Sequence, residues 1–155
     1  MKKSFTLIEI MVSIVIFSLL VLLMSKVLVT LNISLKSLEN MYKEKSLEDY
    51  FIKTIYRDIL EKRFIKIDNN NKNYSIIYIQ TTNSLYKIPA PYVVWYVSKK
   101  NNSIIRLESS QKIILPTSKG YVDKFLDNVK IFKIYQKNGK FLVFLKANKE
   151  IFFEF

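Results

Sequence analysis

Glu9 is the residue whose chemistry most needs an explanation, because it is the only acidic residue among the first thirty. It lies inside the apolar run from Phe5 to Met24, and twenty helical residues span about 30 Å, the thickness of a bilayer core. A lone carboxylate in hydrocarbon costs about 2.5–3.5 kcal/mol on insertion scales. The sequence therefore predicts a functional acid within a membrane-spanning helix, and a cation that neutralises it.

The flanks of the apolar run indicate how this helix is oriented. Lys2 and Lys3 precede the run, and positive charges favour a cytoplasmic N-terminus. A secretory signal would end in a small-residue cleavage site, but here the chain continues as Ser25-Lys26-Val27-Leu28 with helical character intact. These features predict an anchor that stays attached, with the rest of the chain on the far side of the membrane.

The segment Ser4-Phe5-Thr6-Leu7-Ile8-Glu9 resembles the N-terminal motif of type IV pilins and of the pseudopilins of type II secretion systems. In that family a short basic leader and a small residue precede Phe-Thr-Leu-[Ile/Leu/Val]-Glu and an apolar helix. The chain departs from the motif at Ser4, where the family strongly prefers glycine, although a small residue is retained. A generic single-pass anchor with a stray glutamate is the alternative interpretation.

The resemblance implies a role for each residue of the motif. A prepilin peptidase would cut between Ser4 and Phe5 after Lys2 and Lys3 present the leader in the cytoplasm, and the new amine of Phe5 would be N-methylated. Glu9 would then be the assembly charge partner of a Phe5 amine. That amine would belong to a neighbouring subunit in a filament, or to the same chain, since residues four apart share a helix face.

Spacing predicts one helix from about residue 5 to about residue 65. Apolar residues recur every three or four positions, with a single gap of five between Tyr42 and Leu47. No proline precedes Pro89, so nothing in this part of the chain would break a helix. Acidic residues stand four positions before lysines, as in Asp58 and Lys62, which suggests ion pairs on the outer helix face. The resemblance divides the chain into a leader (1–4), a transmembrane half-helix (5–27) and a periplasmic domain (28–155), the last comprising helix 28–66 and a β head (74–155).

From Tyr74 onward the pattern changes to alternation of β-branched and aromatic residues, which is typical of strands. The turns Lys99–Asn102 and Lys137–Lys140 predict two hairpins, and Asn-Gly in the second favours a type I′ turn. The predicted fold class is α+β, a pilin-like lollipop whose long N-terminal helix packs on a C-terminal antiparallel β-sheet head. The predicted strands are Tyr74–Gln80, Ser84–Ile88, Tyr92–Ser98, Ser103–Glu108, Gln111–Leu115, Val129–Gln136, Phe141–Lys146 and Glu150–Phe155.

Composition argues against an enzyme. The chain has neither cysteine nor histidine, so the usual thiol and imidazole nucleophiles, bases and zinc ligands are missing. The only two glycines are Gly120 and Gly139, and no glycine-rich phosphate loop exists. The asparagine-rich stretch 68–73 carries a single carboxylate, so a solvated turn is favoured there over calcium. We expect no catalytic residue, no metal site and no cofactor.

Weaker resemblances suggest a minor subunit. The segments Val93–Val97 and Asn102–Leu107 resemble a hairpin of J-type minor pseudopilins, and Phe125–Phe132 resembles their short helix before a late hairpin. Major pilins usually carry a helix-kinking proline where this chain has Lys26, and the K-type subunit characteristically lacks a glutamate like Glu9. These features imply a minor pseudopilin in a pseudopilus that serves protein secretion, and the hairpin resemblance implies the J type.

The net charge of +12 leaves a second function open. A basic, tyrosine-rich head could attract DNA phosphates and stack bases, as a pilin-like subunit of a type IV pilus or competence machine for DNA uptake would require. The lysines are scattered rather than clustered, so a solvated surface is favoured over nucleic-acid contact. The resemblance implies a single-pass protein of the bacterial inner membrane with a periplasmic domain. Its partners would be other minor and major pseudopilins, the prepilin peptidase and the inner-membrane assembly platform.

Overall fold

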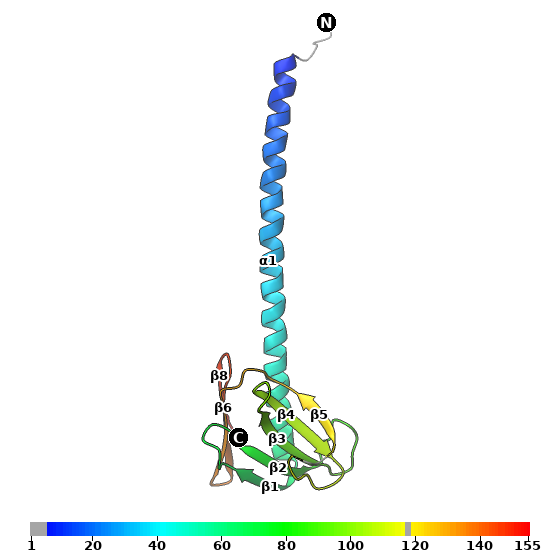
Figure 1. The fold of residues 1–155 in the computed structure, drawn as a ribbon, viewed down its shortest axis with the longest axis vertical. Coiled ribbons are helices and arrows are strands. Elements are labelled where there is room, and N and C mark those ends of the chain that lie inside the picture. Colours follow the sequence, from blue (N-terminus) through cyan, green and yellow to red (C-terminus); the bar gives the residue numbers. More distant parts are fainter. Residues whose placement is uncertain (1–5, 117–118) are drawn as a thin grey trace. The chain divides into compact units, whose positions relative to one another are not determined.

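The structure is a computed structural model that describes residues 6–116 and 119–155, apart from the side chain of residue 44. The chain divides into two compact units, Met1–Lys45 and Ser46–Phe155. One helix, α1 (Leu7–Leu60), contributes to both units, and eight strands follow it (Figure 1). A long apolar N-terminal helix followed by antiparallel sheets confirms the predicted α+β, pilin-like fold class.

In the first unit, the apolar side chains of α1 are exposed. Among the described residues it is the one helix long and apolar enough to cross a membrane. The apolar stripe extends beyond the predicted span, and its members at Leu28, Leu31, Leu35 and Leu38 are all exposed. In the second unit, Tyr50 stacks on Phe125 at 5.2 Å between ring centroids, and Phe51 is the first fully buried residue of α1.

The C-terminal end of α1 corrects the sequence prediction. The helix stops at Leu60, where the Glu61 amide donates to the Arg57 carbonyl at 2.9 Å, rather than near residue 65 or 66. Residues Lys62–Asp68 form strand β1, which pairs antiparallel with β2 (Ile76–Thr81). Pairing of Ile65 with Ile79 and of Ile67 with Ile77 places β-branched side chains on the core face, which a strand accommodates better than a helix end does.

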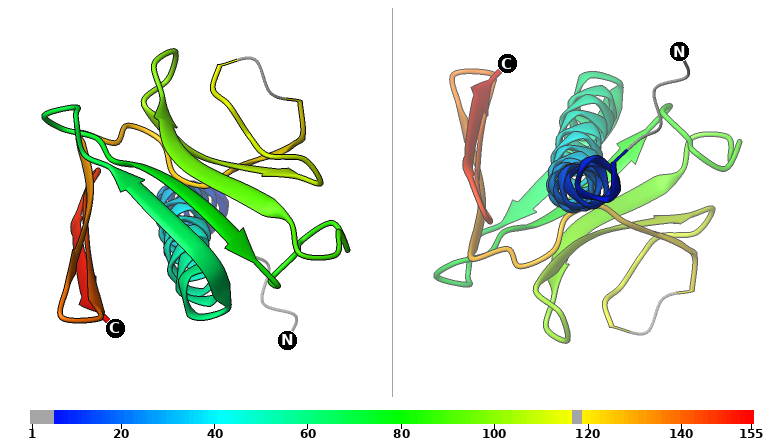
Figure 2. Two further views of the ribbon diagram at one scale, coloured as in Figure 1. Left: turned by 90° about the horizontal axis from the view of Figure 1, so that it is seen from below. Right: turned by 90° about the horizontal axis from the view of Figure 1, so that it is seen from above.

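The second unit contains two antiparallel sheets. The larger has the order β1-β2-β3-β4-β5, with β3 at Tyr92–Ser98, β4 at Ser103–Ser109 and β5 at Tyr121–Lys124. The smaller has the order β6-β7-β8, with β6 at Ile131–Lys137, β7 at Lys140–Lys146 and β8 at Glu150–Glu154. The C-terminal turns of α1 lie against both sheets, which Figure 2 shows from two opposite directions.

Both predicted hairpin turns are confirmed. Ser98 pairs with Ser103 across the turn at Lys99–Asn102, and Asn102 has a positive φ of 48°. In the second hairpin Asn138 and Gly139 have φ values of 52° and 81°, as a type I′ turn requires. Asparagine and glycine tolerate these angles, so local sequence alone fixed the position of both turns.

Three segments differ from their predicted form. Residues 84–88 and 111–115 are loops rather than strands, and positive φ values at Lys87 and Ala90 interrupt the first region. The segment that resembled a short helix, from Phe125 onward, is irregular and includes Asn128 at a φ of 55°. Strand β5, which the sequence analysis missed, is only four residues long and pairs with β4.

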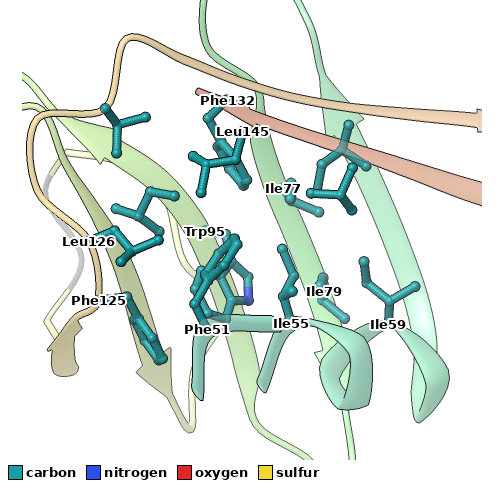
Figure 3. Close-up of a cluster of buried hydrophobic side chains, with 14 of the residues drawn as sticks. Phe51, Ile55, Ile59, Ile77, Ile79, Trp95, Phe125, Leu126, Phe132 and Leu145 are labelled. Atoms are coloured by element: carbon teal, nitrogen blue, oxygen red, sulfur yellow. The ribbon is translucent and has the colours of Figure 1, made fainter. Parts of the chain in front are cut away.

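One hydrophobic core joins α1 to both sheets. Phe51, Ile55 and Ile59 project from α1 into the core that also contains Trp95, which is fully buried (Figure 3). Phe51 makes edge contacts with Trp95, at 5.6 Å between ring centroids, and with Phe132 on β6, at 6.3 Å. The head therefore has a continuous aromatic and aliphatic interior of its own.

The asparagine-rich loop is exposed from residue 69 to residue 73, as expected of a solvated turn, and it also links the two sheets. The Asn69 side-chain amide donates to the Ile134 carbonyl at 3.1 Å, and the Ser75 hydroxyl accepts from the Ile134 amide at 3.0 Å. The Lys133 ammonium donates to the Asn71 carbonyl at 2.6 Å. The loop after β1 thereby satisfies backbone groups along the free edge of β6.

Burial along α1 gives a direct test of where the helix packs. Ile55→Ala should lower the free energy of unfolding of the head by about 2–5 kcal/mol, because it leaves a cavity in the core. Leu35→Ala, at a position 62% exposed, should change it by less than about 0.5 kcal/mol. Thermal and urea unfolding of the full chain in detergent would measure both, and equal losses would show that the helix packs differently.

Candidate functional site

The N-terminus of α1 is a reciprocal capping arrangement between Thr6 and Glu9. The Thr6 backbone amide and the Thr6 hydroxyl each donate to Glu9 Oε2 at 2.9 Å. The Glu9 amide donates back to the Thr6 hydroxyl at 3.4 Å. Thr6 is thus the N-cap residue, Glu9 the third helical residue, and the spacing Thr-x-x-Glu is that of a capping box.

This geometry fixes Glu9 on the first turn of the helix. The positive end of the helix dipole favours a carboxylate there, independently of any other partner. Both contacts use Oε2, and no hydrogen bond among the described residues uses Oε1. One carboxylate oxygen is therefore committed to the cap, and the other is open to a second donor.

The hydroxyl groups of the two serines deeper in the apolar run form hydrogen bonds within the helix. Ser13 donates to the Glu9 carbonyl at 2.7 Å, and Ser18 donates to the Ile14 carbonyl at 2.8 Å. Such bonds remove the need for an external partner at these positions. Glu9 is the only residue of this apolar run that carries a formal charge.

The structure places only part of the predicted site. Lys2, Lys3, Ser4 and Phe5 lie outside the described residues, so the Phe5–Glu9 charge pair stays a prediction. The sequence analysis did not identify Thr6 as a partner of Glu9. The Thr-x-x-Glu spacing immediately before an apolar helix was the signal that could have revealed it.

A second charged cluster, which the sequence analysis missed, lies buried in the head. Asp58 on α1 and Arg106 on β4 are both fully buried, and Arg106 binds Asp58 through Nε at 2.8 Å and Nη2 at 3.1 Å. The Trp95 indole N–H also donates to Asp58, at 2.8 Å. The predicted outer-face pair of Asp58 with Lys62 is therefore wrong, and the Lys62 ammonium instead donates to the Ile59 carbonyl.

Three carboxylates, those of Asp58, Glu108 and Asp123, lie within 4 Å of the Arg106 guanidinium. Glu108 accepts from Arg106 Nη1, from the Ser84 hydroxyl and from the Leu85 amide, so the carboxylate holds the 83–88 loop as well as the guanidinium. Asp123 Oδ2 lies 3.9 Å from Arg106 Nη1 and has no hydrogen bond, although it is buried. The cluster ties together α1, β4, β5 and the loop between β2 and β3.

Burial and hydrogen bonding perturb these groups in different directions. Desolvation raises the pKa of Asp58 despite its bonds from Arg106, Asn83 and Trp95. Burial also opposes ionisation of Glu108, but the bonds from Ser84, Arg106 and the Leu85 amide hold its pKa below the ordinary value. The hydrogen bond that Tyr86 donates to Asp123 raises the pKa of Tyr86 to about 12. These shifts follow from burial and from the hydrogen bonds within one ion-pair network.

The buried cluster should dominate the stability of the head. Arg106→Met would leave Asp58 and Glu108 buried without their cation, and should lower the free energy of unfolding by about 3–5 kcal/mol. Arg63→Met replaces an exposed arginine and should cost less than about 0.5 kcal/mol. Trp95 is the only tryptophan, so its fluorescence during urea unfolding reports on this site. Equal stability of the two variants would contradict the assignment.

Comparison with known proteins supports the N-terminal motif only. Residues 1–25 match a family model described as the prokaryotic N-terminal methylation motif. No curated protein and no solved structure matches the chain. The matched residues include Thr6 and Glu9, and the fold that follows them is pilin-like. The chain therefore carries the N-terminal methylation motif of type IV pilins and pseudopilins at the start of a pilin-like α+β fold.

Proposed function

We propose that this protein is a minor pseudopilin, a structural subunit that nucleates or caps a type II secretion pseudopilus for protein secretion. The observation that supports this most directly is Glu9, which stands on the first turn of an exposed apolar helix within the matched motif. In the proposal, residues 1–4 are the leader, 5–27 cross the inner membrane, and 28–155 form the periplasmic domain. No catalytic group is needed for such a role.

The Thr6–Glu9 geometry gives the assembly step a physical basis. Cleavage between Ser4 and Phe5 creates a cationic amine one residue before the N-cap. Glu9 Oε1 is not used by the cap and can accept from the Phe5 amine of a neighbouring subunit. Pairing of the Glu9 carboxylate with this amine leaves neither charge uncompensated in apolar surroundings. It therefore favours one axial position of each subunit relative to its neighbour.

The remaining partners follow from the same role. Lys2 and Lys3 keep the leader in the cytoplasm, where a prepilin peptidase cuts and methylates the chain, and an inner-membrane assembly platform then adds it to a filament. The lack of a kinking proline at Lys26 fits the uninterrupted helix and favours a minor over a major subunit. A J-type position next to other minor and major pseudopilins is the specific assignment we propose.

A DNA-uptake subunit is the second candidate, supported by the basic charge of the head. Of the lysines there, Lys124, Lys140 and Lys146 pair with acidic side chains, which reduces the cationic surface left for phosphates. Binding that weakens steeply with salt would support this candidate. Absence of binding to DNA at low salt would leave the secretion role.

Processing of the N-terminus tests the class of protein. Protein isolated from its native membrane should begin at Phe5 and carry one extra methyl group, as intact and N-terminal mass analysis would show. Cells without the prepilin peptidase should yield the chain beginning at Met1. A Met1 start in the presence of active peptidase would mean that Ser4 blocks cleavage, and a generic anchor would replace the proposal.

Neutralising Glu9 tests the charge pair. Glu9→Gln keeps the shape of the side chain and should leave membrane insertion intact, but incorporation into filaments should fall by about tenfold or more because a buried amine loses its counter-charge. Glu39→Gln, at an exposed position on the same helix, is the matched control. Quantitative immunoblots of sheared filaments and of membranes would separate the two steps, and normal incorporation of Glu9→Gln would refute the mechanism.

A further inference from the structure

The five-stranded sheet carries a groove on the face that points away from the core. Its volume is about 510 Å³, and its floor crosses β1, β2 and β3. The loop 112–115 forms one wall, anchored by Ile113, which is 4% exposed and packs with Val94 and Leu107. The side chains that shape the groove are Phe64, Lys66, Tyr78, Tyr92, Val94 and Lys112.

Register explains why these side chains share a surface. Phe64 pairs with Gln80 and Lys66 pairs with Tyr78, while Gln80 and Tyr78 pair in turn with Tyr92 and Val94. Their neighbours along each strand, such as Ile79 and Val93, point into the core instead. Alternation therefore builds an apolar and aromatic floor on the outer face, where Phe64 remains 57% exposed.

Two lysines, Lys66 and Lys112, and one acid, Asp68, line the groove. Among the described residues, neither the Lys66 nor the Lys112 ammonium makes an ion pair or a hydrogen bond. The one carboxylate at the groove, that of Asp68, already accepts from the Asn70 amide at 3.0 Å. An occupant that offers carboxylates beside an apolar side chain would fit both the floor and the rim.

Charge argues against a second copy as this occupant. The chain has 25 basic and 13 acidic residues, so two copies repel each other over most of their surfaces. Its most exposed acidic and aromatic strand, β8, already uses Glu150 and Glu154 in ion pairs with lysines of β7. A nucleic acid is also disfavoured, because Lys66 and Lys112 stand singly and no row of cations follows the groove.

We propose that this groove binds an extended acidic segment of a different polypeptide, with one aromatic or branched apolar side chain seated between Phe64, Tyr78 and Tyr92. Carboxylates on both sides of that side chain bind Lys66 and Lys112. Affinity comes from the buried apolar side chain, while the two lysines select acidic over basic segments. The inference depends on the fold of the head and not on the secretion role proposed above.

Defined peptides test this binding on the full chain in lipid nanodiscs. Fluorescence anisotropy would compare labelled Glu-Asp-Phe-Glu-Asp and Glu-Asp-Leu-Glu-Asp with the same peptides in which lysine replaces each acid. The acidic peptides should bind with a Kd below about 1 mM, and the basic ones should not. Lys66→Glu and Lys112→Glu should each weaken binding about tenfold or more, whereas Lys100→Glu, in the β3–β4 turn, should change it less than about twofold.

Several outcomes would overturn the proposal. No binding by either acidic peptide, equal binding of basic peptides, or insensitivity to Lys66→Glu and Lys112→Glu would each exclude an acidic-peptide site. Tighter binding of an eight-residue thymidine oligonucleotide, lost in the same two variants, would reassign the groove to nucleic acid. Concentration-dependent dimers in ultracentrifugation that Lys112→Glu abolishes would instead assign it to a second copy. None of these results depends on N-terminal processing or on Glu9, so they are distinct from a failure of the proposed function.

Discussion

The ion pair between Asp58 and Arg106 is the interaction on which the head depends. It joins the last turn of α1 to the middle of β4, across 48 positions of sequence, inside a region that excludes water. An acid near a helix C-terminus is opposed by the helix dipole, so Asp58 needs a strong external partner. Arg106 supplies two hydrogen bonds to it, and Glu108 and Ser84 extend the same network into the loop between β2 and β3.

The helix dipole acts in opposite directions on the carboxylates at the two ends of α1: it stabilises the charge of Glu9 and destabilises that of Asp58. At the N-terminus Glu9 is favoured by the dipole and by Thr6, so its carboxylate is stable without a distant residue and keeps one oxygen open. At the C-terminus every oxygen of Asp58 is taken by Arg106, Asn83 or Trp95. The Glu9 carboxylate is therefore suited to a partner that can exchange, whereas the Asp58 carboxylate holds α1 to the rest of the head.

The groove on the outer face follows from how the sheet is covered. One face of the five-stranded sheet is buried by α1 and by the smaller sheet, while the other is covered only in part by the loop that contains Ile113. The asparagine-rich loop and Ser75 hold the smaller sheet through β6, which leaves the outer surface of β1 and β2 without a covering element. Apolar side chains such as Phe64 consequently remain accessible beside Lys66 and Lys112.

Local sequence determined much of this protein. The apolar helix, the Glu9 motif, the Asn-Gly turn and the strands around Trp95 all depend on residues close together in the chain, where propensity and spacing decide the conformation. The tertiary structure decided what depends on distant partners. Helical spacing continued past Leu60, yet residues 62–68 form a strand because they pair with β2. Residues 84–88 alternate like a strand but form a loop, in which Ser84 donates a hydrogen bond to Glu108 and Lys87 has a positive φ. The sequence pattern placed Asp58 on the outer face of the helix, whereas the structure buries it in an ion pair with Arg106. Periodicity could not reveal this, because a buried charge is stabilised by a partner distant in the sequence.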